Sequence, residues 1–416
     1  MSIITDLTRM WLTRSVRPFT FRNEYDRTLS FQACQDMGLY VHIPFCRRPC
    51  GFCPYCKEAY SPGRCERYLD ALLREIHLVG GQLSQKKRAT SLYFGGGTPA
   101  LAAPRLKQII GALKEHFVIT EGIGVELHPD NVTVPMLETL RDAGVTKISI
   151  GIQSFQGKYQ DILGRAAVNR RALAAALAEV PFETVSMDFI FALPGQTFED
   201  LKADIDTAFQ SGANHVAIYP LIDFSFTSSE IPAMGKREKR LLLDKITQYC
   251  LGKGYTRNSI WTFSCKSAGY SSMTRDNFLG FGCSATTLLP DQFKINTFSV
   301  DEYCRRIDNG MLPTALTLRF TLRQRMVYYL FWTAYSTKVD SRAFERFFGV
   351  TLRKAYGFEL GLARRLGFVT ERDGVYEMTL KGAFYYHYFE NFYTLSYIDK
   401  MWGLLRNEAF PEGMEL

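Results

Sequence analysis

Short apolar segments alternate with amphipathic helical segments through the first half of this 416-residue chain. The six apolar segments, which we expect to be strands, are residues 39–43, 91–97, 124–129, 147–154, 184–194 and 215–222. The first two of these segments are each followed by apolar residues at helical spacing. After the first segment they are Leu69, Leu72, Leu73, Ile76 and Val79, within 64–79. After the second they are Leu106, Ile109, Ile110 and Leu113, which follow Pro104. Every gap is long enough for a crossover helix, so neighbouring strands are expected to be parallel. The pattern predicts an α/β fold, a partial (β/α)6 TIM-like barrel.

The pattern changes to helices after Leu316, at residues 323–335, 341–349 and 354–369. A hairpin signature over 372–382 follows, with Asp373 and Gly374 as its turn. We therefore expect three units: an N-terminal lead-in (1–37), the barrel with its following glycine-loop segment (38–311), and a C-terminal helical, winged-helix-like lid domain (312–416). A winged helix can bind DNA, but the helices here lack a concentrated basic face, so we do not expect a nucleic-acid partner.

The last stretch, residues 385–416, is rich in aromatic residues. An aromatic stripe at helical spacing is more often core than a cofactor-binding surface, although it could line a pocket for a flat or apolar substrate. No Lys/Arg-rich face supports a membrane contact. Its role stays open at this point.

The composition, 46% hydrophobic and 22% charged residues, is that of a soluble globular protein. The net charge of +8 is spread along the chain, and we interpret it as a mildly basic surface. The sequence contains neither an apolar run of membrane-spanning length nor a secretory signal. We therefore expect a cytoplasmic monomer whose ten cysteines are reduced.

Three cysteines follow the first predicted strand in the pattern C-x3-C-x2-C: Cys46, Cys50 and Cys53, with Phe52 directly before the third. Three thiolates bind three irons of a 4Fe-4S cluster and leave the fourth iron open, whereas electron-carrying clusters usually have four cysteines. A zinc site is the alternative. Zinc motifs favour paired C-x2-C units, and Cys53 and Cys56 form one such pair, but Cys65 is the only cysteine that follows nearby.

Polar groups stand at the carboxyl ends of the later predicted strands, where parallel βα folds gather their chemistry. GGGTP (95–99) follows the second strand, and Glu126, Gln153 and Asp188 lie on or after the next three. Glycines let the backbone approach a ligand closely. Acids and amides on apolar strands need partners, which are either one another or a bound polar ligand.

The open-iron cysteine motif resembles the radical S-adenosylmethionine (SAM) superfamily. The resemblance implies a 4Fe-4S cluster on Cys46, Cys50 and Cys53 and a SAM molecule on the unique iron. It also implies that the reduced cluster cleaves SAM to methionine and a 5′-deoxyadenosyl radical. The GGGTP segment resembles the motif of that superfamily that receives the SAM amino group.

The wider set of motifs between Leu39 and Gly382 resembles the oxygen-independent coproporphyrinogen III oxidase family, in which two SAM molecules bind side by side. The resemblance implies a first SAM at Tyr40, Gly96 and Glu126, and cofactor contact at Gly95 through the GGGTP motif. It implies a second SAM at Phe52, Gly97, Thr98, Gln153, Arg165 and Asp188. The segment GFGCSA (280–285) matches a glycine loop that closes the barrel.

Three departures from that family stand out. Two residues separate Cys53 from Cys56 where the porphyrinogen enzyme has C-x-C. Ala166 and Ala167 follow the LGR segment where many relatives carry histidine, and TRDNFLG (274–280) stands where the haem-chaperone relatives have HN-x2-Y. On these departures we favour transfer of a methyl or methylene carbon from the second SAM to an sp2 carbon of a small-molecule or peptide substrate.

Two alternatives remain, a porphyrin- or haem-modifying enzyme and a haem-binding chaperone-like protein. A flavodoxin- or ferredoxin-type electron donor is expected for an enzyme of this kind. The identity of the substrate, the catalytic residues beyond the cofactor contacts, and the roles of Cys56, Cys65, Cys265 and Cys283 do not follow from the sequence.

Overall fold

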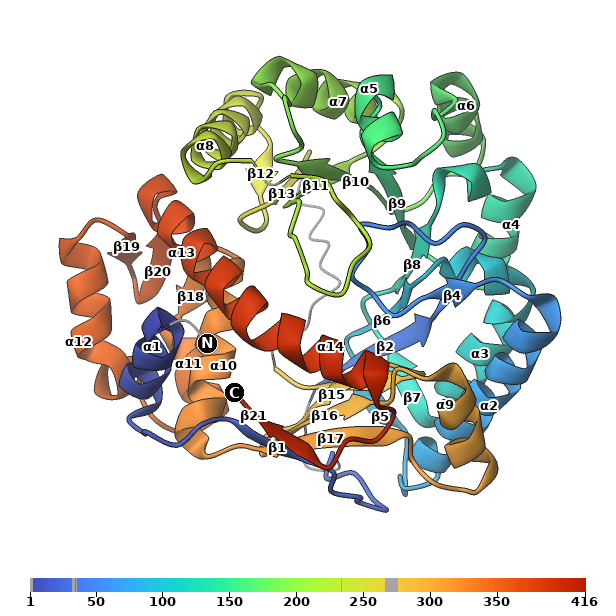
Figure 1. The fold of residues 1–416 in the computed structure, drawn as a ribbon, viewed down its shortest axis with the longest axis horizontal. Helices are drawn as coiled ribbons and strands as arrows, with labels where there is room; N and C mark the ends of the chain where they lie inside the picture. The colour runs from blue at the N-terminus through green and yellow to red at the C-terminus, as the bar shows by residue number, and fades with distance from the viewer. Residues whose placement is uncertain (1–2, 32–33, 35, 233, 266–275) are drawn as a thin grey trace.

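A computed structural model describes residues 3–31, 34, 36–232, 234–265 and 276–416 (Figure 1). Six strands pair in parallel in chain order. They are β2 (Gly38–Ile43), β6 (Ser91–Gly96), β8 (Ile123–Leu127), β9 (Lys147–Gln153), β10 (Thr184–Phe191) and β11 (His215–Pro220). All six predicted strands and their parallel arrangement are confirmed.

Helices cover the outside of this curved sheet (Figure 1). They are α2 (Pro62–Gly80), α3 (Ala103–His116), α4 (Val134–Asp142), α5 (Gly157–Ile162), α6 (Arg170–Glu179), α7 (Phe198–Gln210) and α8 (Lys236–Gly252). Proline in the first turn of α2 supplies the fixed φ of a helix start, and buried residues such as Leu69, Leu72 and Ile76 form the stripe that packs on the sheet. Thr197 and Asp200 form a reciprocal capping box that begins α7.

Short elements connect these units. The strands β3 (Phe45–Cys46) and β4 (Glu58–Ala59) pair with each other in parallel, as do β5 (Lys87–Ala89) and β7 (Phe117–Ile119). Two 3-10 turns, Pro99–Ala102 and Pro129–Asn131, follow β6 and β8.

The sheet continues beyond the six strands to a total of fourteen described strands. β14 (Phe278–Phe281) pairs in parallel with β2, and antiparallel pairing then runs through β15 (Thr286–Leu288), β16 (Gln292–Asn296), β17 (Thr314–Arg319), β1 (Thr20–Arg22) and β21 (Gly413–Glu415). β13 (Thr262–Ser264) and β12 (Thr256–Arg257) extend the other edge, and α9 (Val300–Asp308) connects β16 to β17. Of the segment 274–280, Thr274 and Arg275 lie outside the described residues.

The predicted C-terminal helices are confirmed as α10 (Leu322–Tyr335), α11 (Ser341–Phe348) and α12 (Leu352–Arg365). The predicted hairpin is β19 (Val369–Arg372) and β20 (Val375–Met378), which form a three-stranded sheet with β18 (Lys338–Asp340). Asp373 and Gly374 both have positive φ, 53° and 81°, as a two-residue turn that joins twisted strands requires. The order of helices and strands is that of a winged helix, next to which α1 (Ile3–Thr13) packs.

The aromatic C-terminal segment forms α13 (Leu380–Tyr393), a π-helical turn (Thr394–Ile398) and α14 (Asp399–Asn407), which run as one long element across the front of the barrel in Figure 1. The Trp402 ring lies 6.0 Å from the Tyr55 ring, and the Arg406 guanidinium donates a hydrogen bond to the Pro54 carbonyl. The segment therefore packs against the cysteine loop. The division of the chain into three units stays a prediction. Strand β1 of the lead-in pairs with β17 and with β21, which both belong to the last unit.

Candidate functional site

The cysteine loop leaves the sheet at the carboxyl end of β2. The parallel pairing of β3 with β4, with Cys46 opposite Ala59, holds the two ends of the loop together. The loop therefore projects from the barrel end where the polar residues of the other strands also lie, as expected for chemistry in a parallel βα fold.

Each cysteine of the loop has a polar neighbour. The Thr98 hydroxyl donates a hydrogen bond to the Cys46 sulfur at 3.6 Å, and the Arg165 guanidinium lies 3.5 Å from the Cys50 sulfur. The Lys57 ammonium donates to the Cys53 carbonyl. Burial raises the pKa of Cys46 to about 11 and raises the pKa of Cys53 as well.

The spread of the three sulfurs distinguishes a cluster from a single ion. In the part of the chain that the structure describes, two groups of three ligating side chains have all ligand atoms within 4.8 Å of one another: His42–Cys56–Cys283 and His77–Glu115–His116. The three loop cysteines do not form such a group. This spacing fits ligands that bind different irons of one cluster and does not fit the mononuclear zinc alternative.

Glu126 on β8 is held at the entrance of the glycine segment. Its carboxylate accepts hydrogen bonds from the Tyr93 hydroxyl at 3.0 Å and from the Gly96 backbone N–H at 3.2 Å. The ring of Tyr40 stacks near that of Tyr93, with 6.4 Å between centroids. Tyr40, Gly96 and Glu126, which were predicted to share one SAM-binding position, are thus brought together.

The glycine segment has no room for side chains. Gly96 has a φ of +124°, and a Cβ on Gly97 would lie 2.7 Å from the Phe45 carbonyl oxygen. A Cβ on Gly95 would lie 2.9 Å from the Tyr40 ring. The backbone therefore passes directly beside the cysteine loop, and any larger residue would push the two apart.

Asp188 on β10 has its own set of partners. Its carboxylate accepts hydrogen bonds from Ser149 at 2.8 Å and from Ser186 at 3.1 Å, and the Ser186 oxygen lies 2.9 Å from His215 Nδ1. The hydrogen bonds given above for Glu126 and for Asp188 involve different partners on different strands.

Burial is the main cause that raises the pKa of Glu126 to about 7 and that of Asp188 to about 6. The charge of Asp188 is the second cause of the shift at Glu126, so the two groups face the same interior. Two acids with pKa values near neutrality in one partly solvent-accessible interior are typical of a ligand-binding site.

The remaining predicted residues lie around this interior. Gln153 ends β9 with a φ of +70°, a conformation that non-glycine residues rarely adopt and that often marks functional sites. Phe52 packs against the apolar group of Tyr159, Leu193 and Leu221. Arg165 bridges the Cys50 sulfur and the Gly151 carbonyl, 2.8 Å away, and therefore supports the cysteine loop directly.

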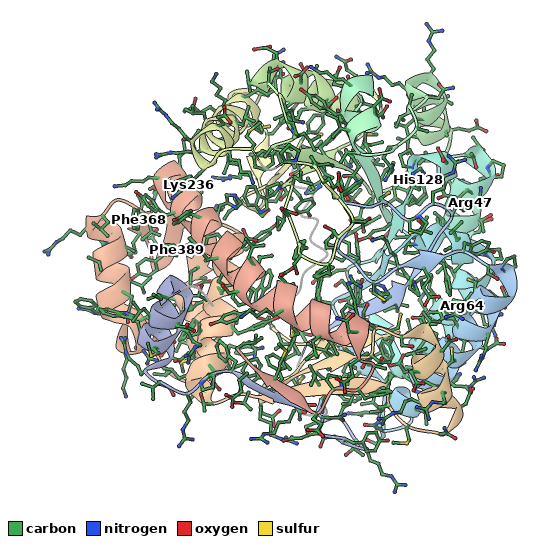
Figure 2. The ribbon with its side chains drawn as sticks, viewed as in Figure 1. Arg47, Arg64, His128, Lys236, Phe368 and Phe389 are labelled. Atoms are coloured by element: carbon green, nitrogen blue, oxygen red, sulfur yellow. The ribbon has the colours of Figure 1, made fainter. Side chains whose placement is uncertain are left out.

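A basic surface surrounds the outer side of the cysteine loop. Arg47 and Arg48 are exposed, and Figure 2 shows Arg47 at the same edge of the barrel as His128. Burial, followed by the charges of Arg165, Arg47 and Arg48, lowers the pKa of His128 to about 4. The exposed charges of Arg47 and Arg48 thus lie in the cysteine loop itself, between Cys46 and Cys50.

Sequence reasoning missed several residues of the site. They are His42, Tyr93, Ser149, Ser186 and His215. His42 lies two positions after Tyr40, and Ser186 lies two positions before Asp188. This alternate spacing is the signal that could have found those two, because residues two apart on a strand share one face.

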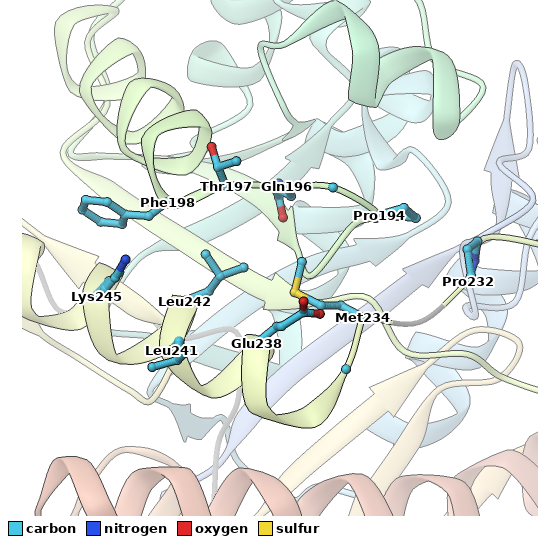
Figure 3. Close-up of a pocket in the computed structure, with 12 residues that line it drawn as sticks. Pro194, Gln196, Thr197, Phe198, Pro232, Met234, Glu238, Leu241, Leu242 and Lys245 are labelled. Carbon is cyan, nitrogen blue, oxygen red and sulfur yellow. The ribbon is translucent and has the colours of Figure 1, made fainter.

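A surface hollow of about 530 Å³ lies elsewhere, between the segment after β10 and helix α8 (Figure 3). It is lined by side chains such as Pro194, Thr197, Met234 and Leu242, and by none of the predicted site residues. The chemistry-bearing groups are at the barrel end, so we do not assign the site to this hollow.

Comparisons with known proteins show which family this chain resembles. Residues 40–208 match the Radical SAM superfamily. An oxygen-independent coproporphyrinogen III oxidase of Cereibacter sphaeroides is 30% identical over 315 residues, which cover 67% of this chain and 68% of that protein. The heme chaperone HemW of Mycobacterium tuberculosis is 33% identical over 198 residues, which cover 45% of this chain and 50% of HemW. The chain thus spans about half the length of that chaperone.

The fold has a close counterpart among solved structures. The coproporphyrinogen III oxidase HemN of Escherichia coli superposes with a TM-score of 0.72 over 85% of this chain and 88% of HemN, at 21% identity. That similarity supports the fold alone. In the described parts of the chain, no helix is both long and apolar enough to cross a membrane.

Proposed function

Because this chain belongs to the oxygen-independent coproporphyrinogen III oxidase family of the radical SAM superfamily, we propose that it acts on a C–H bond of a tetrapyrrole of the coproporphyrinogen type. The observation that carries this proposal is the cysteine loop, which lies beside two independently held carboxylates at the open end of the barrel. The reaction we infer is oxidative loss of carbon dioxide from a propionate side chain.

Cys46, Cys50 and Cys53 would hold the 4Fe-4S cluster. When bound and reduced, the cluster supplies the electron that splits SAM and so generates the radical that removes hydrogen from the substrate. The contacts of Thr98 and Arg165 stabilise negative charge on the sulfurs of Cys46 and Cys50.

We place the first SAM at Tyr40, Gly96 and Glu126, with Gly95 beside them in the glycine segment. The free backbone of the glycine segment offers carbonyl groups to the amino group of a ligand, because no side chain shields them. Glu126 is anchored by Tyr93 and Gly96 and offers an acceptor for ribose hydroxyls. These residues orient the ligand, which is the main contribution a protein makes to cofactor chemistry.

We place a second SAM beside Asp188, Gln153, Thr98 and Phe52. The separate partners of Asp188 support a position distinct from that of Glu126. The raised pKa of both acids supports ligands that replace water around them. Arg165 contacts the Cys50 sulfur, so in this proposal it serves the cluster at least as directly as the second ligand.

The exposed Arg47 and Arg48 support entry of the electron from an acidic partner of the flavodoxin or ferredoxin type. Complementary charge speeds the encounter of two proteins and orients them. The basic surface lies on the cysteine loop itself, so a donor bound there would be as close to the cluster as the fold allows.

The carbon-transfer reaction favoured by the sequence departures is the second candidate. The spacing of Cys56 is what favours it, whereas the match to coproporphyrinogen oxidases over two thirds of the chain favours the tetrapyrrole reaction. The match to HemW is limited to half of that protein, so a haem-binding role without turnover ranks third.

Anaerobic turnover with methyl-deuterated SAM distinguishes the three candidate functions. A coproporphyrinogen substrate should give carbon dioxide and 5′-deoxyadenosine free of deuterium, because the hydrogen comes from the propionate side chain. Deuterium in 5′-deoxyadenosine, together with S-adenosylhomocysteine, would replace this proposal with carbon transfer. Tight haem binding without any 5′-deoxyadenosine would replace it with the chaperone function.

A further inference from the structure

Two cysteines outside the cluster motif meet in the core. The sulfurs of Cys56 and Cys283 lie 3.9 Å apart although the residues are 227 positions apart in the chain. Cys56 ends the cysteine loop, and Cys283 belongs to the glycine loop that follows β14. His42 on β2 joins them, so that one ligand atom of each residue lies within 4.8 Å of the others. All three residues are buried, and the proposed function uses none of them.

The sulfur–sulfur distance fits a shared metal ion better than a disulfide. Two thiolates that bind one tetrahedral zinc ion at about 2.3 Å each stand about 3.8 Å apart. A disulfide bond is about 2.05 Å long, so these sulfurs would have to approach by about 1.9 Å to form one. A metal ion needs almost no movement of either sulfur.

The glycine loop is held in place against such movement. The Gly282 N–H donates to Glu75 at 2.7 Å, and the Cys283 N–H donates to the Tyr68 hydroxyl at 3.0 Å. The Asn296 amide donates to the Gly282 carbonyl at 2.9 Å. Closing the gap to Cys56 would break some of these buried hydrogen bonds, and a buried donor or acceptor left without a partner is destabilising.

Both ring nitrogens of His42 contact other groups. Nε2 lies 2.9 Å from the Cys56 carbonyl oxygen, and Nδ1 lies 3.0 Å from the Tyr40 hydroxyl. A metal ion would replace one of these two contacts, and the other would hold the ring in place, as the second nitrogen of a metal-bound histidine is held. The Phe298 carbonyl oxygen, 3.2 Å from the Cys56 sulfur, can complete a set of four ligands.

The charges of the three side chains match a divalent cation. Two thiolates and a neutral imidazole would neutralise the two positive charges of the ion in a buried site.

We propose that His42, Cys56 and Cys283 form a second metal site, distinct from the cluster, that takes a zinc ion. The ligands are two thiolates and one imidazole, a set that suits zinc, and the burial of all three matches a closed structural site. The ion would join the end of the cysteine loop to the glycine loop and to β2.

The test separates this site from the cluster. In full-length protein with Cys46, Cys50 and Cys53 all changed to serine, about one zinc per chain should remain, measured by elemental analysis after purification. Cobalt added in place of zinc should give a thiolate-to-cobalt absorption band. The further change Cys283→Ser should abolish the band and lower zinc affinity at least tenfold. Cys304→Ser, which alters a buried thiol of α9 outside the site, should leave both unchanged.

In protein with the cluster cysteines intact, Cys283→Ser should keep about four irons per chain and lose the zinc. Absence of zinc and of any cobalt band in the parent protein would overturn the proposal, whether or not the Cys283 variant folds. A Cys56–Cys283 disulfide found by mass spectrometry in protein purified anaerobically would overturn it too. Equal loss of iron and zinc would show that one site had been mistaken for two.

Discussion

The guanidinium of Arg165 lies 3.5 Å from the sulfur of Cys50 and reaches the Gly151 carbonyl with its other nitrogen. The contact places a permanent positive charge, from the loop after α5, against the outermost cysteine of the motif. A charge at this distance acts on the electron affinity of the cluster as well as on its position.

We expect Arg165→Gln to make the cluster harder to reduce. Loss of a positive charge close to a cluster ligand destabilises the extra electron, and at an effective dielectric of about 20 the shift is on the order of 100 mV toward negative potential. A redox titration followed by electron paramagnetic resonance measures it. Arg171→Gln, on the exposed face of α6, is the control. An unchanged potential would mean that the contact positions the loop without tuning it.

Changing Glu126 to alanine and changing Asp188 to alanine should affect SAM cleavage and product formation differently. Glu126→Ala removes two hydrogen bonds to a charged group beside the glycine segment, and we expect SAM cleavage to fall about tenfold or more. Asp188→Ala should leave SAM cleavage measurable while product formation collapses. Quantifying 5′-deoxyadenosine and product in the same reaction gives both values. If both variants cleave SAM like the parent, neither acid binds the cofactor.

The contribution of Glu75 to the stability of the folded protein should decrease as the pH rises. Burial raises its pKa to about 7, although Tyr303, Gly282 and Asn296 all donate to it. Its folded-state pKa exceeds its unfolded value of about 4.5, so its contribution to stability is complete below pH ~4.5 and is lost as the pH rises through about 7.

Glu75→Gln, which cannot ionise, should remove this part of the pH dependence. Melting temperatures of the two proteins, measured from pH 5 to 8, should therefore converge or cross toward the alkaline end. Parallel curves over the whole range would show that Glu75 is ionised in the folded protein throughout.

Reversing the charge at Arg47 and Arg48 should slow reduction by a protein donor. For the double change to glutamate we expect a decrease of about tenfold or more at low salt, which becomes smaller as salt screens the charges. Dithionite, a small reductant that needs no docking, should reduce the variant at nearly the parental rate. A similar slowing with both reductants would point to damage to the cluster and away from a docking surface.

The parallel strands were predictable because each is a nearly continuous apolar run between longer amphipathic segments, a pattern that buried parallel strands require. The extension of the sheet beyond these parallel strands was not predictable from the sequence. β1 and β21 have three residues each, and their pairing depends on β17, almost three hundred residues from β1. Segments of this length carry no periodicity from which pairing could be inferred.

In the candidate site, too, some residues were predictable from the sequence and others were not. Glu126 and Asp188 were found because acids interrupt apolar strands, but their partners Tyr93 and Ser149 look like ordinary strand residues. Arg165 was assigned by resemblance to a SAM position, and only the fold brings it to the Cys50 sulfur. Likewise, nothing in the spacing of Cys56 and Cys283 indicates that their sulfurs meet.

The packing of α14 against the cysteine loop bears on how the protein is made. Arg406, which donates to the Pro54 carbonyl, lies 352 positions after it in the chain, and β21, the partner of β1, follows later still. The strands that carry the cysteines, the glycine segment and both acids are all synthesised earlier. During translation the loop is therefore exposed to the machinery that delivers iron and sulfide, and α14 packs against it only after these later residues have been made.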